Sequence, residues 1–410
     1  MSHAAPHPLT PYDEFPVHQA PHPFSYVPST DYNWDDGYYW GVFSPKDQVF
    51  LAIGLRINPN TDMVGGYALF NENGRQTTVR FNRAWRRDFE LRCGPFRYTV
   101  VEPLKKLHLA LDANDSGLTF DLQWDGICPA YLENHHEAFN RGRHTTNQSR
   151  YSQPGTARGT IALRGRSWEV HPKDWSGSRD HSWGLYAERP PLGPPAHLLP
   201  PKARPAQARA MRFWTCFRAE DYGGFFHFHE TADGAPCETG DVFGGAFAGH
   251  LQHGWKSPVV ALASVERAFT YQPGSRILQR ADLELTDEAG KVWHLDFRSA
   301  APPWVVQTMG YTPGSWKDGG TFHTYHGSEE LALEWDEFDF SRQPFRYTPY
   351  AVSGAAAKDN FGLGLDYDHP IHGIEYLAAV TLRSPTGDVA HGAAQVEHFI
   401  NGRYAPYGFE

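Results

Sequence analysis

Apolar and polar residues alternate along several segments of the chain, as they do in half-buried antiparallel strands. In residues 116–126 the apolar side chains from Leu118 to Trp124 fall on one face, and Asp125-Gly126 supplies a turn. Residues 281–297 repeat the pattern as a strand, a turn and a returning strand. Long amphipathic helical periods are hard to find, while 39 glycines and 32 prolines supply many turns. The pattern therefore predicts an all-β protein.

The chain, at 410 residues, is too long for one ordinary hydrophobic core, and its composition changes along its length. Residues 1–30 are rich in proline and histidine and show no period, so we expect an N-terminal arm. Residues 189–208 are dense in proline and cannot form a central strand, which predicts a long loop. A second set of strands begins near residue 241. We therefore expect two β domains in tandem, residues 31–240 and 241–410.

The charge balance limits the partners that the protein can have. Lysine and arginine number 37 against 47 aspartate and glutamate residues, which gives a formal net charge of −10. A nucleic-acid-binding protein needs a basic footprint, so we expect no nucleic-acid partner. The same charge disfavours docking on an anionic membrane. No apolar run reaches the roughly 18 residues of a membrane helix, and we expect no membrane insertion.

The cysteines and the N-terminal sequence bear on the compartment. The four cysteines are far apart and show no metal-binding spacing, so we expect them to be free, buried and reduced: Cys93, Cys128, Cys216 and Cys237. The start, MSHAAPHPLTPYDEF, has neither the basic nor the apolar region of a secretory signal. These features predict a cytoplasmic protein, and an oligomer is compatible with them.

The segment WSGSRDHSWGLY, residues 175–186, places three ionisable residues between two indoles. In an extended strand Arg179, His181 and Trp183 share one face, and Asp180 points to the other. The sequence leaves open which of the two faces lines a cavity. A buried Asp180 can serve as a general acid if burial raises its pKa, or it can belong to a structural ion pair. We expect the flanking indoles to exclude water from the trio.

Two histidine pairs are further candidates for the site. In FFHFHE, His227 and His229 share a strand face and Glu230 points to the other face. Two histidines at this spacing can bind a metal in a small β-barrel, but no carboxylate follows at a suitable distance. We therefore expect no metal and place His227 in an aromatic pocket. In TFHTYHG, His323 and Tyr325 share a face and are further ligand-binding candidates.

Aromatic residues form the largest compositional signal. They make up 14% of the chain, which exceeds what two modest cores need. Most of them will lie in the cores, and the remainder predicts a cavity for an apolar or aromatic ligand. The tryptophans that we expect to line such a cavity are Trp40, Trp183 and Trp214.

RDHSWG, the preceding YSQPGTARGTIALRG and the following FWTCF resemble the lipocalin-like proteins related to carotenoid 1,2-hydratase. LRCGPFRYTVVEPLKKLHLAL resembles strands of that family's first domain, and the similarity runs from about residue 30 to the end. The resemblance implies two consecutive lipocalin-like antiparallel β-barrels, an interior apolar site and no cofactor. For some members it implies hydration of an alkene, or a related isomerisation, cyclisation or lyase step. The arm, the proline-dense stretch and the histidine clusters depart from the pattern, and the carotenoid substrate is not carried over.

The leading hypothesis is therefore a cofactor-independent enzyme that acts on a hydrophobic isoprenoid or aromatic small molecule. Asp180 would protonate a C=C bond or a leaving group, and Arg179 and His181 would set its protonation state. The indoles would stabilise developing positive charge, and His227 or His323 would be the second acid–base group that positions water.

Two alternatives remain open at this point. One is a non-catalytic binding or carrier protein for an apolar ligand, which would tolerate Asp180→Asn. The other is a metal-dependent enzyme that uses a histidine cluster.

Overall fold

The computed structural model describes residues 16, 20–86, 88–140, 142–186, 209–237, 245–304, 309–310, 314–322, 324–341, 375–400 and 402–410. The proline-dense stretch at 189–208 and most of the expected arm lie outside these residues. At the end of the arm, Asn60 Nδ2 donates to the carbonyl oxygen of Ser29 at 2.7 Å, so this part of the chain lies against the loop after β2. The all-β prediction is confirmed, because the long elements described are all strands.

Thirteen strands form one antiparallel sheet, which we call sheet A. Its order is β19 (Ala332–Asp339), β4 (Arg75–Ala84), β3 (Met63–Glu72), β2 (Val49–Asn58), β1 (Trp34–Ser44), β12 (Ser176–Tyr186), β10 (Arg143–Leu163), β8 (Leu118–Gly126), β7 (Lys106–Leu111), β6 (Phe96–Glu102) and β5 (Arg92–Cys93). β9 (Tyr131–Asn140) and β11 (Arg166–Val170) also pair with β10. The sheet rolls around its own core as a half-barrel, and Arg83 Nε on β4 donates to the Arg92 carbonyl oxygen on β5 at 2.7 Å.

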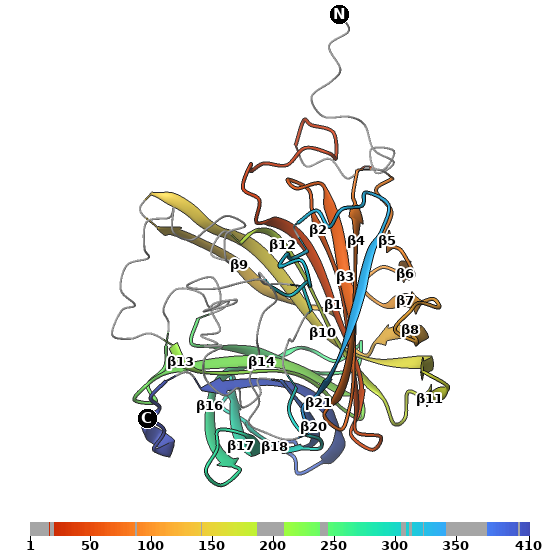
Figure 1. Ribbon diagram of the computed structural model, residues 1–410. Helices are drawn as coiled ribbons and strands as arrows, with labels where there is room; N and C mark the ends of the chain where they lie inside the picture. Colours follow the sequence, from red (N-terminus) through yellow and green to blue (C-terminus); the bar gives the residue numbers. More distant parts are fainter. Residues whose placement is uncertain are drawn as a thin grey trace, which may run out of the picture.

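Eight strands form a closed antiparallel barrel, which stands below sheet A in the view of Figure 1. They are β13 (Arg209–Ala219), β14 (Tyr222–Thr231), β15 (Phe247–His253), β16 (Val260–Tyr271), β17 (Leu278–Asp287), β18 (Val292–Ser299), β20 (Glu375–Arg383) and β21 (Val389–Ile400). A short 3₁₀ helix, η4 (Ala405–Tyr407), follows the last strand. The expected hairpin at 281–297 corresponds to β17 and β18.

The strand pairing crosses the expected division at residue 240 in both directions. β13 and β14 precede that residue, yet they pair with β21 and β15 and so belong to the barrel. β19 follows it, yet it pairs with β4 at the edge of sheet A. The physical reason is that the barrel closes only when β13 bonds to both β14 and β21. The division into 31–240 and 241–410 therefore does not follow the two sheets.

Large apolar clusters hold these layers together. The first fills sheet A and includes the row from Leu118 to Trp124 that the alternation predicted. The second fills the closed barrel. The third joins the outer face of sheet A to the barrel, and it contains Phe43 and Phe50 from the sheet with Leu377 and Ala393 from the barrel. Sheet A is therefore covered by apolar residues on both faces near β1 and β2.

The four cysteines are free and buried, as expected. No helix in the described part of the chain is long and apolar enough to cross a membrane.

A buried arginine attaches β19 to sheet A. The Arg80 side chain is fully buried and forms ion pairs with Glu334 and Asp336 on β19. We expect Arg80→Met to lower the free energy of unfolding by about 3 kcal/mol or more, because it leaves Glu334 without its cation and Asp336 with only the half-exposed Lys317 at 3.6 Å. Arg75→Met, at an exposed position of the same strand, should change it by about 0.5 kcal/mol or less. Denaturant unfolding of both variants measures this, and equal small effects would contradict the buried attachment.

Candidate functional site

Strand β12 divides the expected catalytic trio between two faces of sheet A. Arg179 and His181 lie on the inner face, where Arg179 is opposite Trp40 and His181 is opposite Tyr38 on β1. Asp180 lies on the outer face, which meets the barrel. The neighbouring Ser178 shows this orientation, since its Oγ donates to Gln395 Oε1 on β21 at 2.6 Å. The trio therefore does not form one cluster.

Asp180 is half-buried in a polar layer between sheet A and the barrel. Burial raises its pKa above the ordinary value, while Arg150, Arg56 and His181 act in the opposite direction. Glu397 on β21 raises the pKa further. Arg179 is not among the groups that act on the carboxyl, so the expectation that Arg179 sets the protonation state of Asp180 has no support in this geometry.

Glu133 on β9 is a second acidic group of this layer, and the sequence analysis missed it. Its side chain is buried, and its carboxylate oxygen Oε1 accepts a hydrogen bond from Ser152 Oγ, the residue opposite Asp180 on β10. Burial raises the pKa of Glu133 to about 7, against the effects of Arg150 and Ser152, and Asp180 adds to the increase. The only sequence signal was ENHHEAF, in which the histidines drew attention instead.

The barrel contributes a third buried carboxyl to the same layer. Glu375 on β20 accepts a hydrogen bond from Gln395 Nε2 at 3.2 Å, and the same nitrogen donates to Tyr39 Oη on β1 at 2.9 Å. Burial raises the pKa of Glu375 well above its ordinary value, and Glu397 and Asp180 raise it further. Three acidic side chains are thus shifted towards the protonated form between sheet A and the barrel.

Trp214 and His227 extend outward from the barrel into this layer. They are opposite each other on β13 and β14, and Trp214 is also opposite Glu397 on β21. His227 and His229 share the outward face as predicted, while Glu230 points the other way and pairs with Arg267. Within the described ranges, the buried atoms Trp214 Nε1 and His227 Nε2 have no hydrogen-bond partner.

Arg212 constrains the proton positions on these histidines. Arg212 Nη1 must donate to His229 Nε2, 3.0 Å away, because arginine cannot accept. The proton of a neutral His229 is then on Nδ1, which lies 3.4 Å from His227 Nδ1, and a hydrogen bond between these two atoms requires the proton of His227 on Nε2. Burial lowers the pKa of His227 to about 3, so the ring is neutral at pH 7. In this arrangement His227 Nε2 presents an N–H donor to the layer, and the guanidinium on His229 Nε2 prevents a metal from binding that atom.

The inner face of sheet A holds the other expected residues. His181 stacks on Tyr38 with ring centroids 4.0 Å apart, and its Nε2 is 2.6 Å from Asp36 Oδ1. Trp40 is fully buried beside them, whereas Trp183 is 39% exposed. Trp183 therefore does not shield the trio from water as the sequence analysis expected.

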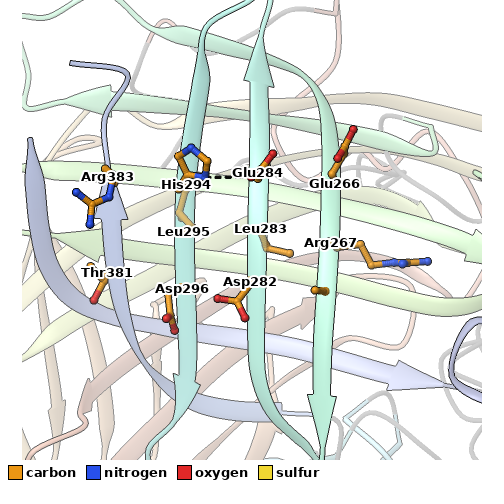
Figure 2. A pocket seen from close by; sticks show the side chains of 11 residues that line it. Glu266, Arg267, Asp282, Leu283, Glu284, His294, Leu295, Asp296, Thr381 and Arg383 are labelled. Carbon is orange, nitrogen blue, oxygen red and sulfur yellow. Dashed lines mark ion pairs between the residues drawn. The ribbon is translucent and has the colours of Figure 1, made fainter. Parts of the chain in front are cut away.

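The remaining expected residues lie elsewhere. His323 is outside the described residues, and Tyr325 is 60% exposed. A groove of about 470 Å³ runs across the outer surface of β16, β17, β18 and β20 (Figure 2). Across the groove, His294 Nδ1 lies 3.4 Å from Glu284 Oε1.

The fold and this acidic layer define an all-β protein with a cluster of carboxyls of raised pKa between a curled sheet and a closed barrel. The chain belongs to a family of unknown function, DUF8625, whose model matches residues 9–364. No curated protein matches the sequence.

Solved structures give weak likenesses. CghA with Sch210972 is 9% identical, covers 90% of this chain and 89% of its own, and has a TM-score of 0.44. Kievitone hydratase from Nectria haematococca is 10% identical, covers 96% of this chain and 97% of its own, and has a TM-score of 0.40. Likeness at this level assigns no substrate and no reaction to this chain.

The raised pKa of Glu133 predicts a pH dependence of stability. Between about pH 4.5 and pH 7 the folded protein keeps a proton on Glu133 that the unfolded chain has released, so the free energy of unfolding falls as the pH rises through this window. Glu133→Gln removes this titration and should reduce the decline by about 1–3 kcal/mol. Denaturant unfolding at pH 4.5 and pH 8 measures it, with Glu169→Gln at an exposed position as the control. An equal decline in the wild type and in Glu133→Gln would contradict the assignment.

Proposed function

We propose that the protein is an enzyme that catalyses acid-dependent addition of water to a C=C bond, or the reverse elimination, on a hydrophobic small molecule. The reaction takes place in the polar layer between sheet A and the barrel. Asp180 and Glu133 are the proton donors, and no cofactor takes part. An isomerisation or cyclisation that begins with the same protonation belongs to the same proposal.

The observation that carries this proposal is the raised pKa of three carboxyls in one layer. A general acid at neutral pH must hold its proton until the reacting group arrives, and a carboxyl achieves this through burial or through a neighbouring carboxylate. Both causes act on Asp180, whose pKa burial and Glu397 raise. A measurement of turnover distinguishes a catalytic carboxyl from one whose pKa is raised in a structural network.

In the hydration direction, a protonated carboxyl of Asp180 or Glu133 transfers its proton to one alkene carbon. The adjacent carbon becomes positively charged, and the face of the Trp214 indole stabilises that charge. Water then bonds to this carbon and loses a proton to the carboxylate, which restores the acid. The Nε2–H donor of neutral His227 orients the water oxygen, or a substrate oxygen, in this step.

The resemblance of RDHSWG and its flanking strands to the relatives of carotenoid 1,2-hydratase agrees in reaction class with this proposal. It supports an isoprenoid or aromatic substrate. The four free, buried cysteines support a cytoplasmic location.

Asp180→Asn separates catalysis from structure, because the amide keeps the shape of the side chain but cannot deliver a proton. A panel of alkenes and phenolic compounds incubated in D₂O, with mass spectrometry of gained water or deuterium, identifies a substrate. We expect the variant to fold and bind that substrate, with turnover lower by about 10²-fold or more. Asp121→Asn, at an exposed position on β8, is the matched control and should keep full turnover.

The other outcomes decide between the hypotheses. Unfolding of Asp180→Asn would favour a structural ion pair, and unchanged turnover would exclude Asp180 as the acid. If the wild type binds members of the panel saturably and converts none, the protein is a carrier.

A further inference from the structure

Arg179 is a buried cation on the inner face of sheet A, and it forms no ion pair with the described residues. Its side chain is 2% exposed. Nε donates to Gln153 Oε1 at 2.8 Å, and Nη1 donates to Tyr151 Oη at 3.3 Å. Nη2 is buried and has no hydrogen-bond partner in the part of the chain that the structure describes. Burial of a charge is unfavourable unless a counter-charge and a full set of hydrogen bonds compensate it, so this arginine is incomplete by itself.

The side chains around Arg179 hold it in place without neutralising it. Its guanidinium carbon lies 5.2 Å from the ring centre of Trp124 and 5.1 Å from that of Tyr151. Gln153 is fixed in turn, because its Nε2 donates to the carbonyl oxygens of Leu104 and Cys128. Burial raises the pKa of Tyr151, so this phenol is uncharged at pH 7 and is no counter-ion.

An acidic group on this face, Asp36, is already engaged. Asp36 lies two residues before Tyr38 on β1, and its Oδ1 is 2.6 Å from His181 Nε2. Tyr98 also faces the cluster, and burial raises its pKa, so it is neutral as well. In the described part of sheet A, the positive charge of Arg179 therefore has no partner of opposite sign.

Two further donors on the same face lack acceptors. The indole nitrogens Trp40 Nε1 and Trp124 Nε1 are buried and have no hydrogen-bond partner among the described residues. Trp40 is directly opposite Arg179 in the pairing of β1 with β12. Several buried hydrogen-bond donors around one cation favour a ligand group that only accepts hydrogen bonds. An ionised carboxylate is such a group.

The exposure along β12 gives a direction of approach. Arg179 is 2% exposed, the His181 side chain is 17% exposed, and Trp183 is 39% exposed. The three side chains share one face, so the row leads from solvent to the buried guanidinium. Aromatic rings line this row, since Tyr38 stacks on His181 and Tyr151 meets its edge at 5.4 Å.

We propose that the inner face of sheet A binds the carboxylate of a small aromatic acid, with Arg179 as the anion-binding residue. The aromatic body of the ligand stacks along Tyr38, His181 and Trp183, and the carboxylate reaches Arg179 Nη2. This site lies on the opposite face of β12 from Asp180 and is independent of the proposed reaction.

Calorimetric titration with trans-cinnamate and cinnamamide tests the site, because the two probes share one shape and differ in charge. We expect the wild-type protein to bind cinnamate at least about tenfold more tightly than cinnamamide, and Arg179→Gln to reduce this preference to about threefold or less. Arg158→Gln removes an arginine that is 56% exposed on β10, and it should leave the preference unchanged. Equal affinities of the wild type for both probes, or an unchanged preference in Arg179→Gln, would overturn the proposal.

Arg179→Lys keeps the charge and removes the planar fork that Gln153 and Tyr151 hold, so it covers the case in which Arg179→Gln fails to fold. This variant should bind cinnamate several-fold more weakly than the wild type and still prefer it to cinnamamide. Cinnamate affinity equal to that of the wild type would show that the guanidinium does not contact the carboxylate. Loss of all cinnamate binding in a folded Arg179→Lys protein would support the proposed contact.

Discussion

The two-residue period of strand β12 is the constraint on which both sites depend. Because β12 lies in the middle of sheet A and both faces of the sheet are covered, consecutive side chains enter two different buried environments. The Arg179 side chain lies among aromatic rings, and the Asp180 side chain lies in a layer of carboxyl and guanidinium groups. Two consecutive residues therefore differ in their surroundings. Arg179 has no counter-ion among the described residues, and burial raises the pKa of Asp180.

The layer between the sheet and the barrel contains more acidic side chains than it can keep ionised. Glu397 is paired with Arg212 Nε at 2.6 Å, and this pairing leaves Glu133, Glu375 and Asp180 to compete for the remaining positive charge. Arg212 also orients His229, and through it the proton of His227. The Arg212 guanidinium thus influences both the charge of the layer and the N–H donor of His227. Arg212, Glu397 and His227 lie on three different strands of the barrel.

Local periodicity explains what the sequence could predict. The strand at 118–126, the hairpin at 281–297 and the opposite directions of His229 and Glu230 all depend on neighbours within a few residues, and they were correct. The alternation of Arg179 and Asp180 was also evident, but no local pattern indicates which layer covers each face of the strand. Glu133, the contact of Asp36 with His181 and the addition of β19 to β4 depend on residues far apart in the chain, where no local pattern carries a signal.

The pairing of β19 with β4 has a consequence for the order in which the molecule is assembled. β4 ends at Ala84, and its partner begins only at Ala332, after most of the barrel strands have been synthesised. On the ribosome, the edge of β4 therefore remains without its partner while the intervening chain emerges, and an open strand edge is a site for unwanted association. Pairing of β19 with β4 closes that edge. Sheet A can therefore be completed only late in translation, after Ala332–Asp339 has been synthesised.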